Sequence, residues 1–183
     1  MSKNKKSDKE LKNKKKVNKT EKVKKPFKKK RVMFISSEGG HMSELQQLEF
    51  EKYDYTVVTE KTETTIGLTK KYKDRIYFLK YGTKKTLIRY ILMMLFINFP
   101  KSLYLFLKIR PQVVVSTGAH TGVMMCYIAR FFGKKVIWIE SFANHTTKSA
   151  SGKLAYPIAN TFVVQWKEMK KLYPKAEYWG GIF

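Results

Sequence analysis

Residues 31–41 read RVMFISSEGGH, and this stretch decides the fold. Its first part, 31–36, is an apolar run of the length of one strand, and it leads through paired glycines into a helix-like segment. Paired glycines at such a junction let the backbone approach a ligand closely. A strand, a glycine loop and a helix in this order make up the first unit of a parallel α/β sheet.

The same alternation continues along the chain. Short apolar runs predict strands at 31–36, 55–59, 75–79, 112–116, 135–140 and 161–165, with a further short one at 176–179. Helices are predicted at 43–52, 83–109, 121–132, 152–158 and 166–172, the first beginning at Ser43 because Ser43 and Gln46 have capping-box spacing. Several strands are apolar throughout, as strands covered on both faces are. We therefore predict a Rossmann-like parallel sheet in a single α/β domain over 31–183.

Positive charge is concentrated at the start of a basic chain. The 183 residues carry a formal net charge of +24, and residues 1–31 alone hold 16 Lys and Arg against three carboxylates. Mutual repulsion and the scarcity of apolar residues predict a disordered, lysine-rich arm over 1–30. A secretory signal would need an apolar segment after its positive start. The sequence has none there, so we expect a cytoplasmic location.

Neither a metal site nor a nucleotide cofactor is expected. Cys126, the only cysteine, lies in an apolar run and is predicted to be a core residue. The three histidines have no close ligand spacing. The glycine loop matches neither the G-x-G-x-x-G pattern of dinucleotide binders nor a P-loop.

Polar residues follow three of the predicted strands at the same edge of the sheet. A second loop, STGAHTG at 116–122, repeats the position of the first, and the next strand delivers Glu140 at its end. We expect a ligand there, with His41 and Glu140 as candidate catalytic residues and Ser37, Gly39, Gly40, Gly118 and His120 as candidate ligand-binding residues. For each, a tight turn or a surface position stays open as an alternative, as it does for His145.

The segment 87–107 is far more apolar than one amphipathic stripe requires. Its uninterrupted apolar part is short of the ~20 residues that cross a bilayer, and Asn98, Pro100 and Lys101 interrupt it. We predict a membrane-associated helix at about 86–108 that is kinked or broken at Pro100 and lies in the membrane interface. A helix buried in the core is the alternative. The residues expected to face the membrane are Tyr90, Leu92, Leu95, Phe96 and Phe99.

Several motifs together resemble one family. They are SSEGGH at 36–41, STG at 116–118, WIE at 138–140, GKLAYP at 152–157, VQW at 164–166 with EMKK and YPK after it, and GGIF at 180–183. The resemblance covers about 31–183. The family includes MurG, the PssD-type subunits and enhancer-like capsule proteins of β-1,4-galactosyltransferases, and the membrane subunit of the dolichol-linked N-acetylglucosamine transferase.

This resemblance implies the N-terminal half of a GT-B glycosyltransferase, inactive alone. A separate C-terminal-half subunit would hold the UDP-sugar, and this chain would anchor it at the cytoplasmic face of the cell membrane, peripherally, as a monotopic protein or with a single span. The chain would contribute the side of the site that binds a lipid-pyrophosphate-linked acceptor, in capsular or exopolysaccharide synthesis. By the same resemblance no bound metal is needed.

Two other functions fit parts of the sequence. A lysine-rich arm and a pI near 10 are typical of nucleic-acid-binding proteins. However, no RNA- or DNA-binding motif accompanies the charge, and the apolar segment has no use in such a protein, so we expect no nucleic acid partner. A purely scaffolding subunit, whose loops touch no substrate, is the second alternative.

Overall fold

The computed structural model describes residues 29–82 and 87–182. The predicted arm at 1–30 lies almost entirely outside these residues, as does the predicted helix start at 83–86. The side chains of Leu87 and Tyr90 also fall outside the description.

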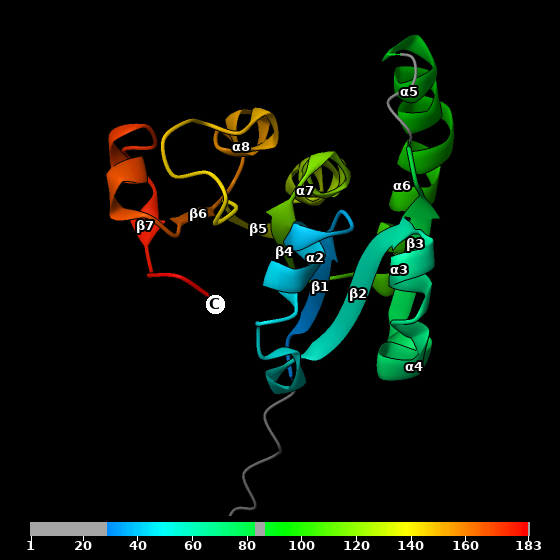
Figure 1. Cartoon of the computed structure of the whole chain (residues 1–183). Coiled ribbons are helices and arrows are strands. Elements are labelled where there is room, and N and C mark those ends of the chain that lie inside the picture. The colour runs from blue at the N-terminus through cyan, green and yellow to red at the C-terminus, as the bar shows by residue number, and fades with distance from the viewer. Residues whose placement is uncertain (1–28, 83–86, 183) are drawn as a thin grey trace, which may run out of the picture.

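Seven parallel strands form one sheet, in the order β3-β2-β1-β4-β5-β6-β7 (Figure 1). The strands are β1 Arg31–Ser36, β2 Asp54–Lys61, β3 Ile76–Lys80, β4 Val113–Gly118, β5 Lys135–Ile139, β6 Thr161–Val164 and β7 Glu177–Tyr178. The order reverses between β1 and β4, as it does in doubly wound Rossmann-like sheets. The predicted fold class and all seven predicted strands are therefore confirmed, with bounds shifted by one or two residues at most ends.

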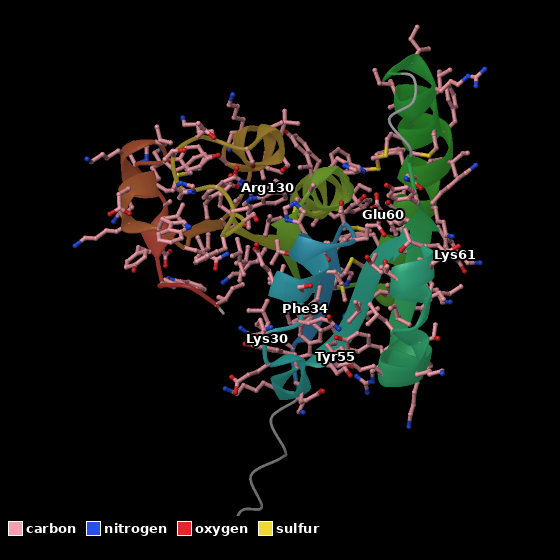
Figure 2. All side chains as sticks on the ribbon, viewed as in Figure 1. Lys30, Phe34, Tyr55, Glu60, Lys61 and Arg130 are labelled. Carbon is pink, nitrogen blue, oxygen red and sulfur yellow. The ribbon has the colours of Figure 1, made fainter. Side chains whose placement is uncertain are left out.

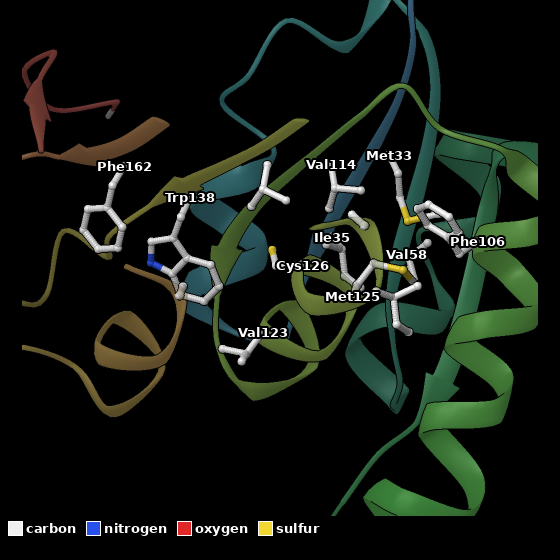
Figure 3. Close-up of a cluster of buried hydrophobic side chains, with 14 of the residues drawn as sticks. Met33, Ile35, Val58, Phe106, Val114, Val123, Met125, Cys126, Trp138 and Phe162 are labelled. Carbon is white, nitrogen blue, oxygen red and sulfur yellow. The ribbon is translucent and has the colours of Figure 1, made fainter. Parts of the chain in front are cut away.

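Helices cover both faces of the sheet and create two apolar cores. One face carries α2 Gly40–Leu45, α3 Glu63–Ile66 and α4 Thr69–Tyr72 together with a 3-10 turn at Phe50–Lys52. The other carries α6 Phe99–Ile109, α7 His120–Phe131, α8 Ala150–Ala155 and a 3-10 turn at Lys167–Lys171. Cys126 lies fully buried in this second core, as predicted (Figure 3). The chain changes face after β3, so α2 and α7 leave β1 and β4 toward opposite faces.

The predicted helix at 43–52 is wrong in extent. Helix α2 begins at Gly40 and ends at Leu45, and the chain then turns before the 3-10 turn at Phe50–Lys52. Ser43 is not a cap; its hydroxyl donates to the Gly39 carbonyl from inside the first turn. The start lies earlier because Gly39, the residue before the helix, has a φ of 74° and turns the chain into α2 at Gly40.

Other helical segments also differ from prediction. The prediction missed α3 and α4, although Thr62 caps α3 through a reciprocal pair of bonds with Thr65. The helix predicted at 166–172 is a 3-10 turn, and the one predicted at 152–158 is α8, displaced by two to three residues.

The long apolar helix is continuous through Pro100. It consists of α5 Leu87–Met93, a π-helical turn at Met94–Asn98 and α6. The break expected at Pro100 is absent because Pro100 lies in the first turn of α6, and the Phe99 N–H already bonds five residues back, to the Met94 carbonyl. The part Ile91–Ile109 has 19 residues and a mean hydropathy of 1.4, enough by length and composition to cross a membrane.

Asn98 attaches this helix to the edge of the sheet. Its amide nitrogen donates to the Lys80 carbonyl at 2.9 Å, and its amide oxygen accepts the Lys80 N–H at 3.0 Å. The polar residue that interrupts the apolar segment is thus buried and paired with the last residue of β3.

Candidate functional site

The loops that leave β1 and β4 are joined at the centre of the carboxyl edge. The Ser37 N–H donates to the Gly118 carbonyl at 2.7 Å, and the Ala119 N–H donates to Ser37 Oγ at 3.1 Å. Thr117 Oγ1 donates to the His41 carbonyl at 2.7 Å. Two loops that lie far apart in sequence therefore form one site at the point where the strand order reverses, which is where open α/β sheets bind ligands.

Two of the predicted glycines are required by the backbone. Gly39 has a φ of 74° and Gly118 a φ of 108°, a region that residues with a Cβ rarely adopt. Gly118 also lies under the His41 imidazole, because a Cβ at Gly118 would lie 3.1 Å from His41 Nδ1. Gly40 has open space around its Cα, so its surroundings give no steric reason for a glycine.

His41 has a buried nitrogen that no other described residue satisfies. Its ring lies against Gly118, and Nδ1 has no hydrogen-bond partner within the part of the chain that the structure describes. A buried polar atom without a partner is costly, and native proteins rarely leave one unexplained. The unbonded nitrogen marks the His41 ring as a candidate site residue, although Nδ1 itself is covered by the protein.

His120 is held by a buried carboxylate that the sequence analysis missed. Glu60, at the end of β2 where α7 begins (Figure 2), lies 3.0 Å from His120 Nε2 and accepts a 2.7 Å bond from Thr121 Oγ1. Burial alone would raise the pKa of Glu60, but the bonds from His120 and Thr121 outweigh it and leave the pKa below its ordinary value. A carboxylate that directly follows an apolar strand was the signal used for Glu140, and it could have identified Glu60.

A second missed carboxylate, Glu44, fixes the helix that carries His41. Glu44 is buried and accepts bonds from Ser141 Oγ at 2.7 Å, the Phe142 N–H at 3.0 Å and Gln165 Nε2 at 3.1 Å. Burial raises its pKa, and these bonds offset the effect only in part. Glu44 lies one helical turn after His41, and its bonds attach the loops beyond β5 and β6 to α2.

Glu140 is bonded to its own chain. The side chain is 1% exposed and accepts bonds from Trp138 Nε1 at 3.0 Å, the Ser149 N–H at 3.1 Å and Tyr173 Oη at 3.4 Å. Burial, and then the charge of Glu140, raise the pKa of Tyr173. This geometry joins β5 to α8, and the catalytic role expected for Glu140 stays a prediction.

Carboxylates gather at this edge of a strongly basic chain. Besides the three buried ones, Glu38 lies on the glycine loop, and its Oε2 accepts a 3.2 Å bond from Thr64 Oγ1. Carboxyl groups are therefore concentrated at this edge of a chain whose net charge is +24. Hydroxyl groups suit such surroundings better than phosphates do.

His145 does not join the other two histidines. His41 and His120 flank the β4 loop, whereas the ring of His145 lies 5.9 Å from that of Trp166, beyond β5. Within residues 29–82 and 87–182, no group of three or more His, Cys, Asp or Glu side chains is placed to hold a metal ion.

The long helix exposes apolar side chains in α5 and in the π-helical turn that follows it, a region called the α5 end below. Four of the residues expected to face a membrane are exposed, Phe96 to 73%, while the side chain of the fifth, Tyr90, lies outside the description. Leu105 and Phe106 of α6 are instead buried in the core. The alternative of a core helix thus holds for the inner face of α6 but not for the helix end that projects from the body (Figure 1).

Comparison with known proteins identifies the family. The family described as "Oligosaccharide biosynthesis protein Alg14 like" matches residues 17–182. The chain belongs to the Alg14 family. The Alg14-family protein of Debaryomyces hansenii, named a UDP-N-acetylglucosamine transferase subunit, is 29% identical over 174 residues, covering 81% of this chain and 75% of the relative. Relatives of the same name from Schizosaccharomyces pombe and Homo sapiens are 39% and 37% identical over 77 and 81 residues. Those two alignments span about two fifths of this chain, and 37% and 38% of the length of the relatives.

Solved structures agree with this assignment at the level of fold. MurG from Acinetobacter baumannii has a TM-score of 0.62 at 16% identity, covering 76% of this chain and 42% of MurG. UDP-GlcNAc 2-epimerase from Neisseria meningitidis has a TM-score of 0.64 at 12% identity, covering 83% of this chain and 47% of the epimerase. The Alg14-family chain thus has the fold of one Rossmann-like half of these two-lobed proteins, which confirms the predicted half of a GT-B fold.

Proposed function

We propose that this chain is the non-autonomous, membrane-bound subunit of a two-component UDP-N-acetylglucosamine transferase, and that it supplies the acceptor side of the active site. The observation that carries the proposal is the family match over 17–182, because the relatives are named subunits of such an enzyme. A fold that matches less than half of MurG supports it, since a GT-B site lies between two Rossmann-like halves.

The partner subunit completes the enzyme by holding the UDP-sugar. The face of the sheet that it covers lies over β1, β4 and β5, where an apolar groove of about 520 Å³ is open. Val113 and Ile137 form part of its floor, and Lys30, Lys52 and Lys135 are among its lining residues. Apolar surface of this kind favours a stable protein contact.

The point between β1 and β4 where the strand order reverses is called the switch point. There, His41 is the group best placed to accept a proton. In the transfer, the acceptor hydroxyl oxygen forms a bond to the sugar C1, the bond from C1 to UDP breaks, and the hydroxyl proton passes to a base. The position of the His41 ring over Gly118, where the β1 and β4 loops meet, supports that role, while Ser37, Gly39, Gly118 and His120 shape the acceptor side of the site. For Gly40, only its position next to Gly39 and His41 supports a place in the acceptor site.

The exposed α5 end anchors the complex to the membrane. Phe96, Leu95 and Leu92 enter the apolar layer of an anionic cytoplasmic leaflet, to which the basic residues of the chain are attracted. Together with the lysine-rich arm this makes two weak anchors. The acceptor is therefore a lipid-linked sugar presented at the membrane surface.

The synthesis to which the acceptor belongs is the finer part of the proposal. Capsular or exopolysaccharide synthesis is the context expected from sequence, but the relatives named here are UDP-N-acetylglucosamine transferase subunits and none is a capsule protein. The family match also favours a transferase subunit over a nucleic-acid-binding protein.

Co-expression with the partner subunit and a transfer assay test the proposal. The complex is assayed with UDP-GlcNAc on two kinds of lipid-pyrophosphate-linked acceptor, one from capsular or exopolysaccharide synthesis and one linked to dolichol. The chains compared are wild type, His41→Ala and the matched control His145→Ala. We expect His41→Ala to lose at least about a hundredfold in kcat, the low end for a general base, while both variants still bind the partner. Activity of His41→Ala equal to that of His145→Ala would leave only the scaffolding role.

A further inference from the structure

A second pocket lies away from the switch point, between the end of β3 and the exposed part of the long helix. Its volume is about 460 Å³, and it is lined by Lys80, Tyr81, Arg89, Leu92, Met93, Phe96 and Ile97. The lining therefore combines two cationic side chains with a mostly apolar wall. Phosphate groups bind cations, and hydrocarbon binds apolar walls.

The pocket is built by the contacts that fix the helix to the sheet. The two bonds between Asn98 and the Lys80 backbone hold the strand end against the helix. The π-helical turn Met94–Asn98 carries Phe96 and Ile97 on the pocket wall, and π turns of this kind occur frequently at functional sites. These contacts thus fix the position of Lys80 relative to the apolar wall.

Neither cation is paired with a carboxylate of the described residues. In the described part of the chain, neither Lys80 nor Arg89 forms an ion pair with a carboxylate. Both are exposed at the surface of the pocket. An anionic group with a hydrocarbon tail is complementary to these two charges and to the wall beside them.

The position of the pocket connects the membrane to the switch point. Helix α5 projects beyond the carboxyl ends of the strands, the edge of the sheet at which the candidate site lies (Figure 1). The end of β3 is two strands away from β1. Two strand spacings amount to about 10 Å, a distance that a pyrophosphate carrying one sugar can bridge.

Charge argues for the phosphate at this pocket and against the glycine loop. Glu38 and Glu60 lie at the loop of His41, and a phosphate there would meet their carboxylates. Lys80 and Arg89 offer the opposite charge at the neighbouring strand end.

We propose that this pocket binds the phosphate end of the lipid-linked acceptor, with the first part of its hydrocarbon chain along Leu92 and Phe96. The inference rests on the proposed function and makes it more specific. The phosphate lies at Lys80 and Arg89, the lipid follows α5 into the membrane, and the sugar hydroxyl reaches His41 at the switch point.

Binding to vesicles tests the pocket with the full chain. Phosphatidylcholine vesicles carry either polyprenyl phosphate or, at equal surface charge, phosphatidylglycerol. The variant Lys80→Gln/Arg89→Gln removes both pocket cations, and Lys101→Gln/Lys153→Gln removes two exposed cations elsewhere. We expect the pocket variant to lose about tenfold in affinity for polyprenyl phosphate vesicles relative to the control, and both variants to weaken equally on phosphatidylglycerol.

Other outcomes overturn the inference. Equal losses for the two variants on polyprenyl phosphate would mean general attraction to an anionic surface. Loss of the partner subunit from the pocket variant, with lipid binding unchanged, would make the pocket a protein interface.

The transfer assay separates this inference from the proposed function. An active complex in which the pocket variant leaves the KM for acceptor unchanged rejects the pocket alone. A complex without transferase activity, whose pocket variant still loses polyprenyl phosphate binding, rejects the proposed function alone.

Discussion

The Glu60 carboxylate lies 3.0 Å from Nε2 of His120 and joins the end of β2 to the first turn of α7. Because β1 lies between β2 and β4, this bond closes over the end of β1, where the glycine loop begins. Glu60 is 1% exposed in its side chain, so the pair is shielded from solvent on the carboxylate side. The site is thus held together by contacts between strands that are not neighbours in the sheet.

We predict that Glu60 makes stability depend on pH in the acidic range. Its pKa in the folded chain lies below the ordinary 4.5, so the unfolded chain binds the proton more readily. The stabilisation is therefore present above pH 4.5 and is lost as the pH falls through the lower, folded pKa. Glu60→Gln should lose about 1–3 kcal/mol at pH 7 and show a shallower decline on acidification. Urea unfolding at several pH values measures both, and identical pH slopes would contradict the role of Glu60.

The contrast between Gly152 and Gly67 provides a second prediction. A Cβ on Gly152 would collide with Glu140 Oε2 and lie 2.6 Å from Tyr173 Oη, so Gly152→Ala should destabilise the fold by about 1–3 kcal/mol. Gly67 has a helical φ of −62°, and a Cβ there would meet only the Thr64 carbonyl oxygen at 4.0 Å, so Gly67→Ala should be neutral or stabilise by about 0.4–1 kcal/mol. Thermal unfolding of both variants checks the difference. Equal effects would mean that the junction of Glu140 with α8 is not closely packed.

Local sequence was sufficient to predict the strands. Each is an apolar run such as 31–36 that stands out against charged neighbours, and its position in a parallel sheet follows from the alternation with helices. Short helices were predicted less well. The run 43–52 carries helix-forming residues, but Phe50 packs into the core from a 3-10 turn instead, a tertiary contact that propensity does not contain.

The polar part of the site was predicted only where it follows a recognisable loop. His41, Gly39 and Gly118 lie in such loops and come together as expected. Glu60 and Glu44 were missed because their partners are distant in the chain. His120 is 60 residues from Glu60, and Gln165 is 121 residues from Glu44. No local pattern records such pairs.

We predict that Asn98 stabilises the attachment of the long helix. Asn98→Leu leaves the Lys80 N–H and carbonyl without partners and should cost about 2 kcal/mol. Ser102→Ala is the matched control on the same helix, because the buried Ser102 hydroxyl has no hydrogen-bond partner among the described residues. Urea unfolding and amide exchange at Lys80 measure the loss. Faster exchange at Lys80 in the control than in Asn98→Leu would reject this attachment.

The apolar α5 end should control membrane binding. Leu95→Asp/Phe96→Asp places two charges where the apolar layer is expected, and each carboxylate inside a bilayer costs up to about 2.5–3.5 kcal/mol. In a vesicle flotation assay we expect this variant to stay unbound at the bottom of the gradient. The control Ile66→Asp, on α3, should still float with the vesicles. Flotation of the double variant like wild type would place the anchor elsewhere.

Cysteine labelling then decides whether the helix lies in the interface or spans the bilayer. The native chain gives a low background, since burial raises the pKa of the Cys126 thiol and shields it from reagents. Ile88→Cys and Lys108→Cys place thiols near the two ends of the helix. We predict an interfacial helix, because Asn98 ties its middle to the sheet edge and the inner face of α6 is buried in the core. An impermeant maleimide added on the side of the protein body should therefore label both variants. Labelling of Lys108→Cys alone from that side, and of Ile88→Cys alone from the other, would establish a span instead.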